Sequence, residues 1–159
     1  TEEETIFNMV NAMLFRIHQS GYLGQIGEQR MQYVREGIAC YKKIREDIRE
    51  GIPCWPTGLA SMSDEYISLK YQEIAEEYIS YGLINGGKQY LAVWRTGGEG
   101  EKSFEIPLVG KSGAAAEVSC IYPENKETSF TVSGNCLTVS LAPKSARLFL
   151  AVTETREQS

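Results

Sequence analysis

The chain is 159 residues long, enough for one average domain or two small ones and too short for a complete (β/α)8 barrel. Apolar residues make up 42% and charged residues 23%, ordinary globular values that exclude a collagenous or wholly disordered chain. The net charge of −5 provides no basic field to gather phosphates, so we expect no nucleic-acid partner. No apolar run approaches the roughly 20 residues that span a bilayer, and we expect no membrane partner.

The start of the chain and its cysteines bear on where the protein works. No signal peptide is visible, and we expect a cytoplasmic location. The chain begins with Thr1 inside an acidic, helix-like pattern, so we expect it to be a piece of a longer polypeptide. Its four cysteines have no C-x-x-C or His/Cys metal-ligand spacing. We therefore expect reduced thiols, no metal and no cofactor.

The first elements have helical periodicity. In residues 1–14 apolar side chains recur every three or four positions, and Thr1 with Glu4 has the spacing of a capping box. Residues 14–17 either continue this helix or form a short buried strand, because four residues are too few for their periodicity to distinguish the two. Residues 20–27 hold three glycines and predict a loop.

The strongest helical pattern covers Glu28–Glu50, where apolar side chains form one stripe along the whole segment. Gly51 is placed to end this helix as a left-handed C-cap. The two helices alone cannot close a core, so we expect them to belong to a larger α-rich or α/β domain. In the isolated chain they should dock on the strands, self-associate or aggregate, because exposing the apolar stripe to water costs free energy.

The second half of the chain has the period of β-strands. Residues 78–84 and 89–95 flank an Asn-Gly-Gly-Lys sequence, which predicts a hairpin because Asn and Gly accept positive φ angles at low cost. Turn residues then separate five further alternating segments, centred on residues 106, 120, 131, 139 and 150. About seven short strands without intervening helices predict an antiparallel β-sandwich.

These patterns predict an α+β chain with four parts. Residues 1–51 hold the two helices and the possible short strand, and residues 52–63 form a linker that carries Pro53, Trp55 and Pro56. Residues 64–153 form the sandwich, although residues 64–77 also suit a short helix. Residues 154–159 are a polar tail.

No complete catalytic constellation is present in the sequence. The Gly-Gly-Glu-Gly run at 97–100 lies between strands and predicts a hairpin loop, not a phosphate-binding loop. The acidic runs at 2–4 and 76–77 are expected to be solvated helix faces. Trp55 and Trp94 could stack against a sugar ring, but we expect Trp94 in the core, whereas both alternatives stay open for Trp55.

His18 is the one histidine and the best candidate for a ligand contact. It follows an apolar run and opens a Gly-containing loop before a long helix. In a (β/α)8 barrel such a loop lies at the C-terminal face, where active sites form. We therefore predict that His18, Ser20 and Gly21 contact substrate. The competing interpretation is that His18 only hydrogen-bonds the barrel rim.

Four blocks resemble, in this order, the C-terminal part of family 36 glycoside hydrolases, the α-galactosidases of the melibiase type. Together they extend the resemblance over nearly the whole chain. The blocks are residues 8–21 (NMVNAMLFRIHQSG), 41–45 (YKKIR), 55–59 (WPTGL) and 90–95 (YLAVWR).

The resemblance implies a retaining hydrolase acting on terminal α-galactosides, with an α-galactoside oligosaccharide as substrate. In this family both catalytic aspartates lie upstream of the matched region, so no residue here is assigned as nucleophile or acid/base. The resemblance also makes residues 1–51 the last β/α unit of a (β/α)8 barrel, with 14–17 as its eighth strand and Glu28–Glu50 as its final helix. Phe15 departs from relatives, which often carry Gly there.

Two other functions remain open from the sequence. The chain could be a non-catalytic carbohydrate-binding or interaction module, which an exposed aromatic strip on one sheet face would favour. It could also be an intracellular scaffold with no sugar ligand.

Overall fold

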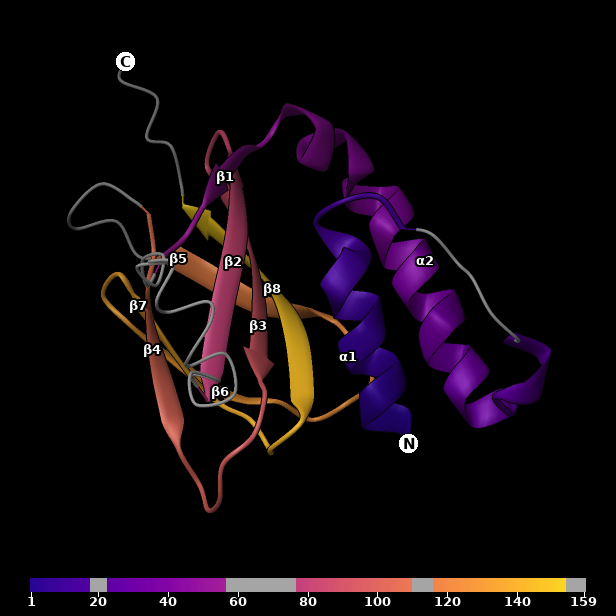
Figure 1. The fold of residues 1–159 in the computed structure, drawn as a ribbon. Helices are drawn as coiled ribbons and strands as arrows, with labels where there is room; N and C mark the ends of the chain where they lie inside the picture. The colour runs from indigo at the N-terminus through magenta and orange to yellow at the C-terminus, as the bar shows by residue number, and fades with distance from the viewer. Residues whose placement is uncertain (18–22, 57–76, 110–115, 154–159) are drawn as a thin grey trace, which may run out of the picture.

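The computed structural model describes residues 1–17, 23–56, 77–109 and 116–153. Within these ranges the chain forms a helical layer, a five-stranded sheet and a three-stranded sheet (Figure 1). The helices are α1 (Glu2–Met13), the short 3₁₀ helix η1 (Leu23–Gln25) and α2 (Glu28–Glu50). The strands are β1 (Ile52–Cys54), β2 (Tyr78–Asn85), β3 (Lys88–Arg95), β4 (Ser103–Pro107), β5 (Ala116–Tyr122), β6 (Ser129–Ser133), β7 (Cys136–Ser140) and β8 (Ser145–Thr153).

Helix α1 begins as the sequence predicts. The Thr1 hydroxyl accepts a hydrogen bond from the backbone N–H of Glu4, and the Glu4 carboxylate accepts one from the Thr1 backbone nitrogen. The capping box is therefore confirmed. The predicted apolar positions form the buried face of the helix: Ile6, Met9, Val10 and Met13.

Helix α2 has the predicted bounds, and its buried face includes Val34, Gly37 and Ile44. Gly37 is important because it has no side chain. A Cβ there would lie 2.6 Å from Cε of Met9 and 3.2 Å from the ring of Tyr122 on β5. The missing side chain thus lets α1 and the sheet approach α2 closely.

The end of α2 differs from the prediction. Gly51 is extended, with φ −72° and ψ 147°, so it is not a left-handed C-cap. A Cβ at this position would lie 2.8 Å from the carbonyl oxygen of Asp47 and 3.2 Å from Cβ of Leu83. Glycine is therefore required here by close packing and not by a positive φ angle.

The predicted linker 52–63 also needs correction at its start. Its first three residues form β1, which pairs antiparallel with β2 and puts Cys54 opposite Gly82. Because β1 is an edge strand, Pro53 can lack a backbone N–H without breaking a central ladder. The rest of the linker beyond residue 56, and the predicted start of the sandwich at residue 64, lie outside the described residues.

The sheets are antiparallel, as the sequence predicts. The larger has the strand order β1-β2-β3-β8-β5 and the smaller β4-β7-β6. The β2–β3 hairpin is confirmed, with Asn85 opposite Lys88 and Gly86 at φ +59°. Strands β3 and β4 belong to different sheets, so the loop at 97–100 is a crossover and not the predicted hairpin loop.

Two apolar cores lie on opposite faces of the larger sheet. Between this sheet and the helices are Tyr90, Ala92 and Trp94 of β3, packed with the α1 and α2 stripes. Between the two sheets are Leu91 and Val93 of β3, packed with residues of β4, β7 and β8. Strand β3 is therefore buried on both faces, and the expected docking of the helices on the strands is seen.

Residues 14–17 form no strand within the described chain. Leu14 is buried at the end of α1, and the Phe15 N–H bonds back to the carbonyl of Ala12 at 3.0 Å. A parallel barrel strand needs hydrogen-bonded neighbours on both sides, and none of the described strands pairs with this segment. No helix in the described part of the chain combines the length and apolar character that crossing a membrane requires.

Candidate functional site

The sequence-predicted substrate contacts His18, Ser20 and Gly21 lie outside the described residues. Their assignment stays a prediction. The described residues nevertheless contain two surface features that could meet a ligand: a pocket beside α1 and an exposed aromatic cluster.

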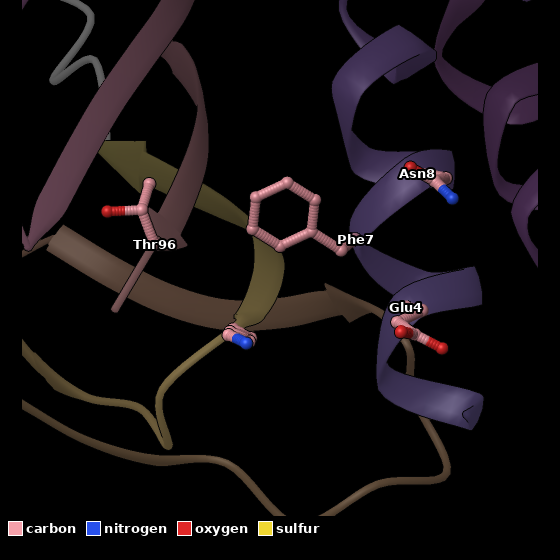
Figure 2. A pocket seen from close by; sticks show the side chains of 5 residues that line it. Glu4, Phe7, Asn8 and Thr96 are labelled. Carbon is pink, nitrogen blue, oxygen red and sulfur yellow. The ribbon is translucent and has the colours of Figure 1, made fainter. Parts of the chain in front are cut away.

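The pocket lies between α1 and the ends of two neighbouring strands. Figure 2 shows the ring of Phe7 reaching from α1 toward Thr96, with Asn8 and Glu4 on the same helix. The cavity measures about 230 Å³, and Lys144 completes its lining. The surface of this cavity is mostly apolar, and Phe7 contributes its aromatic ring.

The aromatic cluster joins three segments. The rings of Phe15 and Tyr81 stack with centroids 4.9 Å apart, and Trp55 meets Tyr81 edge-on at 5.7 Å. Phe15 is 52% exposed and Trp55 44% exposed, so each ring offers surface to solvent. Flat apolar rings of this kind suit the C–H face of a sugar or the apolar surface of a partner.

The other aromatic candidate, Trp94, is a core residue as predicted. Its exposed fraction is 9%, and it packs with the apolar stripes of the helices. It is therefore not available for sugar stacking. The sequence pattern was informative here because Trp94 lies in the middle of an uninterrupted apolar strand.

The loop at 97–100 has its carbonyls occupied by a buried cation. The Arg95 guanidinium, 1% exposed, donates to the carbonyls of Gly97 at 3.2 Å and Gly100 at 2.9 Å. It also donates to the carbonyl of Leu141 on the far side of the sandwich at 2.7 Å. The loop is thus organised by Arg95.

The first acidic run is not simply a solvated face. The Glu3 carboxylate accepts from Arg147 Nη1 at 2.9 Å and pairs with Lys126 at 3.0 Å, while Glu2 accepts from the Tyr33 hydroxyl at 3.3 Å. Burial alone would raise the pKa of Glu3, but the hydrogen bonds from Arg147 and Lys126 outweigh it and lower that pKa. These carboxylates anchor α1 and are not positioned as a catalytic pair.

A second carboxylate anchors the end of α2. Asp47 accepts hydrogen bonds from Asn85 at 2.8 Å, from Lys88 at 2.7 Å and from the hydroxyl of Tyr90. The bonds from Lys88 and Tyr90 hold the pKa of Asp47 below its ordinary value. This contact ties the helix to the β2–β3 hairpin and leaves the carboxylate fully engaged.

Cys40, Cys54 and Cys120 offer no activated thiolate. All four cysteines of the chain are free, as predicted, and burial raises the pKa of Cys40 to about 11. Burial also raises the pKa of Cys54 and Cys120, so these thiols stay protonated at neutral pH and are weak nucleophiles. Among the described residues, no group of three His, Cys, Asp or Glu side chains is arranged to hold a metal ion.

Sequence reasoning missed the residues of both surface features except Trp55. The lining of the pocket comes from residues 4–8, 96 and 144, and the cluster joins residues 15, 55 and 81. No local periodicity or motif links such distant positions. The 4, 7, 8 spacing on α1 does place three side chains on one helix face, but that face alone does not predict a cavity.

Comparison with known proteins gives a likeness of fold. No protein-family model and no curated protein sequence matches the chain. An α-amylase from Anoxybacillus matches it with a TM-score of 0.50 and 11% identity, over 84% of this chain and 24% of the α-amylase. An isomaltulose synthase from Erwinia rhapontici matches with a TM-score of 0.47 and 15% identity, over 87% of this chain and 22% of that one.

The chain thus spans about a quarter of the length of each of these enzymes. The α-amylase comparison establishes a shared fold and nothing about substrate, because 11% identity is too low to carry over a specificity. The described residues, two helices and antiparallel sheets, therefore share the fold of a part of this α-amylase.

Proposed function

We propose that the chain is the C-terminal part of a retaining glycoside hydrolase that cleaves terminal α-galactosides. The observation that carries this proposal is the fold, shared over 84% of the chain with part of a glycoside hydrolase. The four ordered blocks that resemble family 36 narrow the proposal to α-galactosides. In this proposal the chain is a structural β-domain plus the end of the catalytic barrel.

The chemistry of such an enzyme needs two carboxylates, one as nucleophile and one as general acid and base. In the described residues, Glu2, Glu3 and Asp47 are engaged in ion pairs and hydrogen bonds that anchor the helices. The resemblance to family 36 implies that the proposed parent carries its catalytic aspartates upstream of this chain. The 159-residue chain should be inactive on its own.

The outer surface of α2 supports a further layer on the helices. Ile38 and Tyr41 belong to the predicted apolar stripe and are only partly buried, although Ile38 already packs against the core beneath the helices. In the proposed parent, the rest of the barrel covers them. Because both side chains are already partly buried, this would add only a fraction of the roughly 1.5–3 kcal/mol that burying a fully exposed large apolar side chain contributes.

Activity measurements on the chain and its parent test this proposal. The full-length parent should hydrolyse 4-nitrophenyl α-D-galactopyranoside, and the purified 159-residue chain should not. The α-glucopyranoside is the matched control substrate. If the parent cleaves only the glucoside, it is a glycosidase but not one specific for galactosides. The assignment would be overturned if the isolated chain turned over substrate or if the parent turned over neither substrate.

We also propose that His18, with Ser20 and Gly21, borders the sugar subsite of the parent. Replacing His18 by Ala there should lower kcat/KM at least tenfold, about 1.4 kcal/mol of transition-state stabilisation, with little change in Tm. Gln25→Ala in η1 is the matched control and should keep full activity. Unchanged kinetics, or a loss of activity explained by unfolding, would show that His18 does not contact substrate and would favour a hydrogen bond to the barrel rim.

The exposed aromatic cluster favours a second candidate function, carbohydrate binding without catalysis. Phe15 and Trp55 each present a ring to solvent around Tyr81. If binding is the function, an immobilised galactoside polymer should retain the isolated chain, and Trp55→Ala should abolish this retention. Retention by the chain together with an inactive parent would favour this candidate over the hydrolase.

A further inference from the structure

The turn between β2 and β3 carries the one Asn-Gly pair of the chain, Asn85 and Gly86. Asn85 is the last residue of β2, and Gly86 opens the turn with φ +59°. Gly86 is exposed, and a Cβ on it would meet no atom within 4 Å. The peptide bond between these two residues therefore lies at an open tip of the larger sheet.

An Asn-Gly pair can lose ammonia through an attack by its own backbone. The Gly86 nitrogen bonds to Cγ of Asn85, the bond from Cγ to the amide nitrogen breaks, and that nitrogen leaves as ammonia with the Gly86 proton. Water then opens the resulting succinimide at either carbonyl and leaves aspartate or isoaspartate at position 85. The sum consumes water, releases ammonia and changes no oxidation state. Glycine favours the ring closure because no Cβ obstructs the rotation of its backbone.

The Asn85 amide also ties the hairpin to helix α2. Its Nδ2 donates to Oδ1 of Asp47 at 2.8 Å, and Lys88 Nζ donates to the other carboxylate oxygen at 2.7 Å. Closing the succinimide turns the Asn85 side chain toward its own backbone, which breaks the hydrogen bond to Asp47. Asp47 therefore restrains the reaction while α2 is docked.

Deamidation would reverse the effect of residue 85 on this contact. An ionised carboxylate at position 85 has no proton to donate, and it brings a second negative charge beside Asp47. Among the described residues, Lys88 is the one lysine that pairs with Asp47, and it would then face two carboxylates. Because like charges at this separation repel, the hairpin would hold α2 less firmly.

We propose that Asn85 is a site of spontaneous deamidation, that its hydrogen bond to Asp47 slows the reaction, and that the carboxylate formed loosens the last turn of α2 from the β2–β3 hairpin. The inference concerns this chain alone and does not rest on its proposed role in a glycoside hydrolase.

Mass spectrometry of the folded chain, incubated at mildly alkaline pH and then digested, measures the reaction. Deamidation should appear at Asn85 before Asn125, which is exposed but followed by Lys126. Asp47→Ala should raise the rate at Asn85 about tenfold and leave the rate at Asn125 unchanged, whereas Glu46→Ala, at the neighbouring exposed position, should change neither. The proposal would be overturned if Asn125 reacted first, if Asn85 did not react, or if Asp47→Ala had no effect or accelerated both sites equally.

Hydrogen exchange measures the consequence for α2. Asn85→Asp reproduces the aspartate product and should speed exchange in the last turn of α2 about tenfold. Asn125→Asp adds the same charge elsewhere and should leave that exchange unchanged, while Asn85→Ala removes the donor without adding a charge and should have a smaller effect. Equal exchange in Asn85→Asp and the unaltered chain would overturn the proposed loosening. An effect of Asn85→Ala as large as that of Asn85→Asp would show that charge repulsion is not its cause.

Discussion

The two faces of the five-stranded sheet are covered in different ways. Toward the three-stranded sheet, the contact is an apolar core with aromatic pairs, such as Phe130 against Phe149 at 5.4 Å. Toward the helices, an apolar core is bordered by charged contacts at the Glu3–Arg147 and Asp47–Lys88 pairs. The sandwich is therefore joined mainly by apolar packing, with hydrogen bonds that join Arg95 and Tyr78 to the backbone of Leu141, whereas the helices are also positioned by pairs of charged side chains.

This difference teaches how the helical layer is fixed in register. Apolar burial is non-directional, so it can hold a helix on a sheet without setting its exact position. Charge-assisted hydrogen bonds have defined geometry, and they lie at the first turn of α1 and the last turn of α2. We expect the helical layer to respond to pH and the intersheet core to be insensitive to it.

The largest effect should come from the intersheet core. Phe149 is fully buried between the sheets, and Phe149→Ala should lower the free energy of unfolding by about 3–5 kcal/mol through lost burial and a residual cavity. Val132→Ala on the exposed face of β6 is the control and should change it by less than about 0.5 kcal/mol. Denaturant unfolding measures both. A loss under about 1 kcal/mol for Phe149→Ala would contradict the assignment of this face as a tightly packed core.

A smaller effect should follow from weakening the anchor of α1. Glu3→Gln removes the charge that faces Arg147, whose side chain is 6% exposed, and should cost about 1–3 kcal/mol at pH 7. The pKa of Glu3 is lower in the folded protein than in the unfolded chain. This stabilisation is therefore complete above about pH 5 and is lost as the pH falls through the folded pKa.

Unfolding measurements at pH 7 and at acidic pH test this sign. The difference between Glu3→Gln and the unaltered chain should shrink on acidification, because protonation removes the same charge. Glu46→Gln, at an exposed position of α2, is the control and should show a small difference at both pH values. A difference that grows at low pH would mean that the Glu3 carboxylate destabilises the fold.

The smallest effect should come from Asp47. Asp47→Asn keeps the shape but removes the charge that accepts from Lys88 and Tyr90, and about 1 kcal/mol should be lost. The loss should be local, with faster hydrogen exchange in the last turn of α2 and the β2–β3 hairpin. Glu50→Gln at the same helix end is the matched control. Uniformly faster exchange throughout the sandwich would show that the contact is not confined to the helical layer.

Much of the fold could be read from the sequence where the signal is local. The capping box of α1, the residue range of α2 and the Asn85–Lys88 turn depend on neighbours within a few residues, and all agree with the structure. The burial of Trp94 was predictable for the same reason. Its strand is apolar on consecutive positions, which is typical of a strand covered on both faces.

Contacts between distant residues were decided only by the tertiary structure. Gly51 suits a C-cap by sequence, but the packing of Leu83 against it and the pairing of β1 with β2 make it extended. Glu3 meets Arg147 across most of the chain, and the pocket gathers residues from three segments. Periodicity and turn chemistry report on residues close in sequence, whereas these contacts arise from the order in which the strands and helices pack.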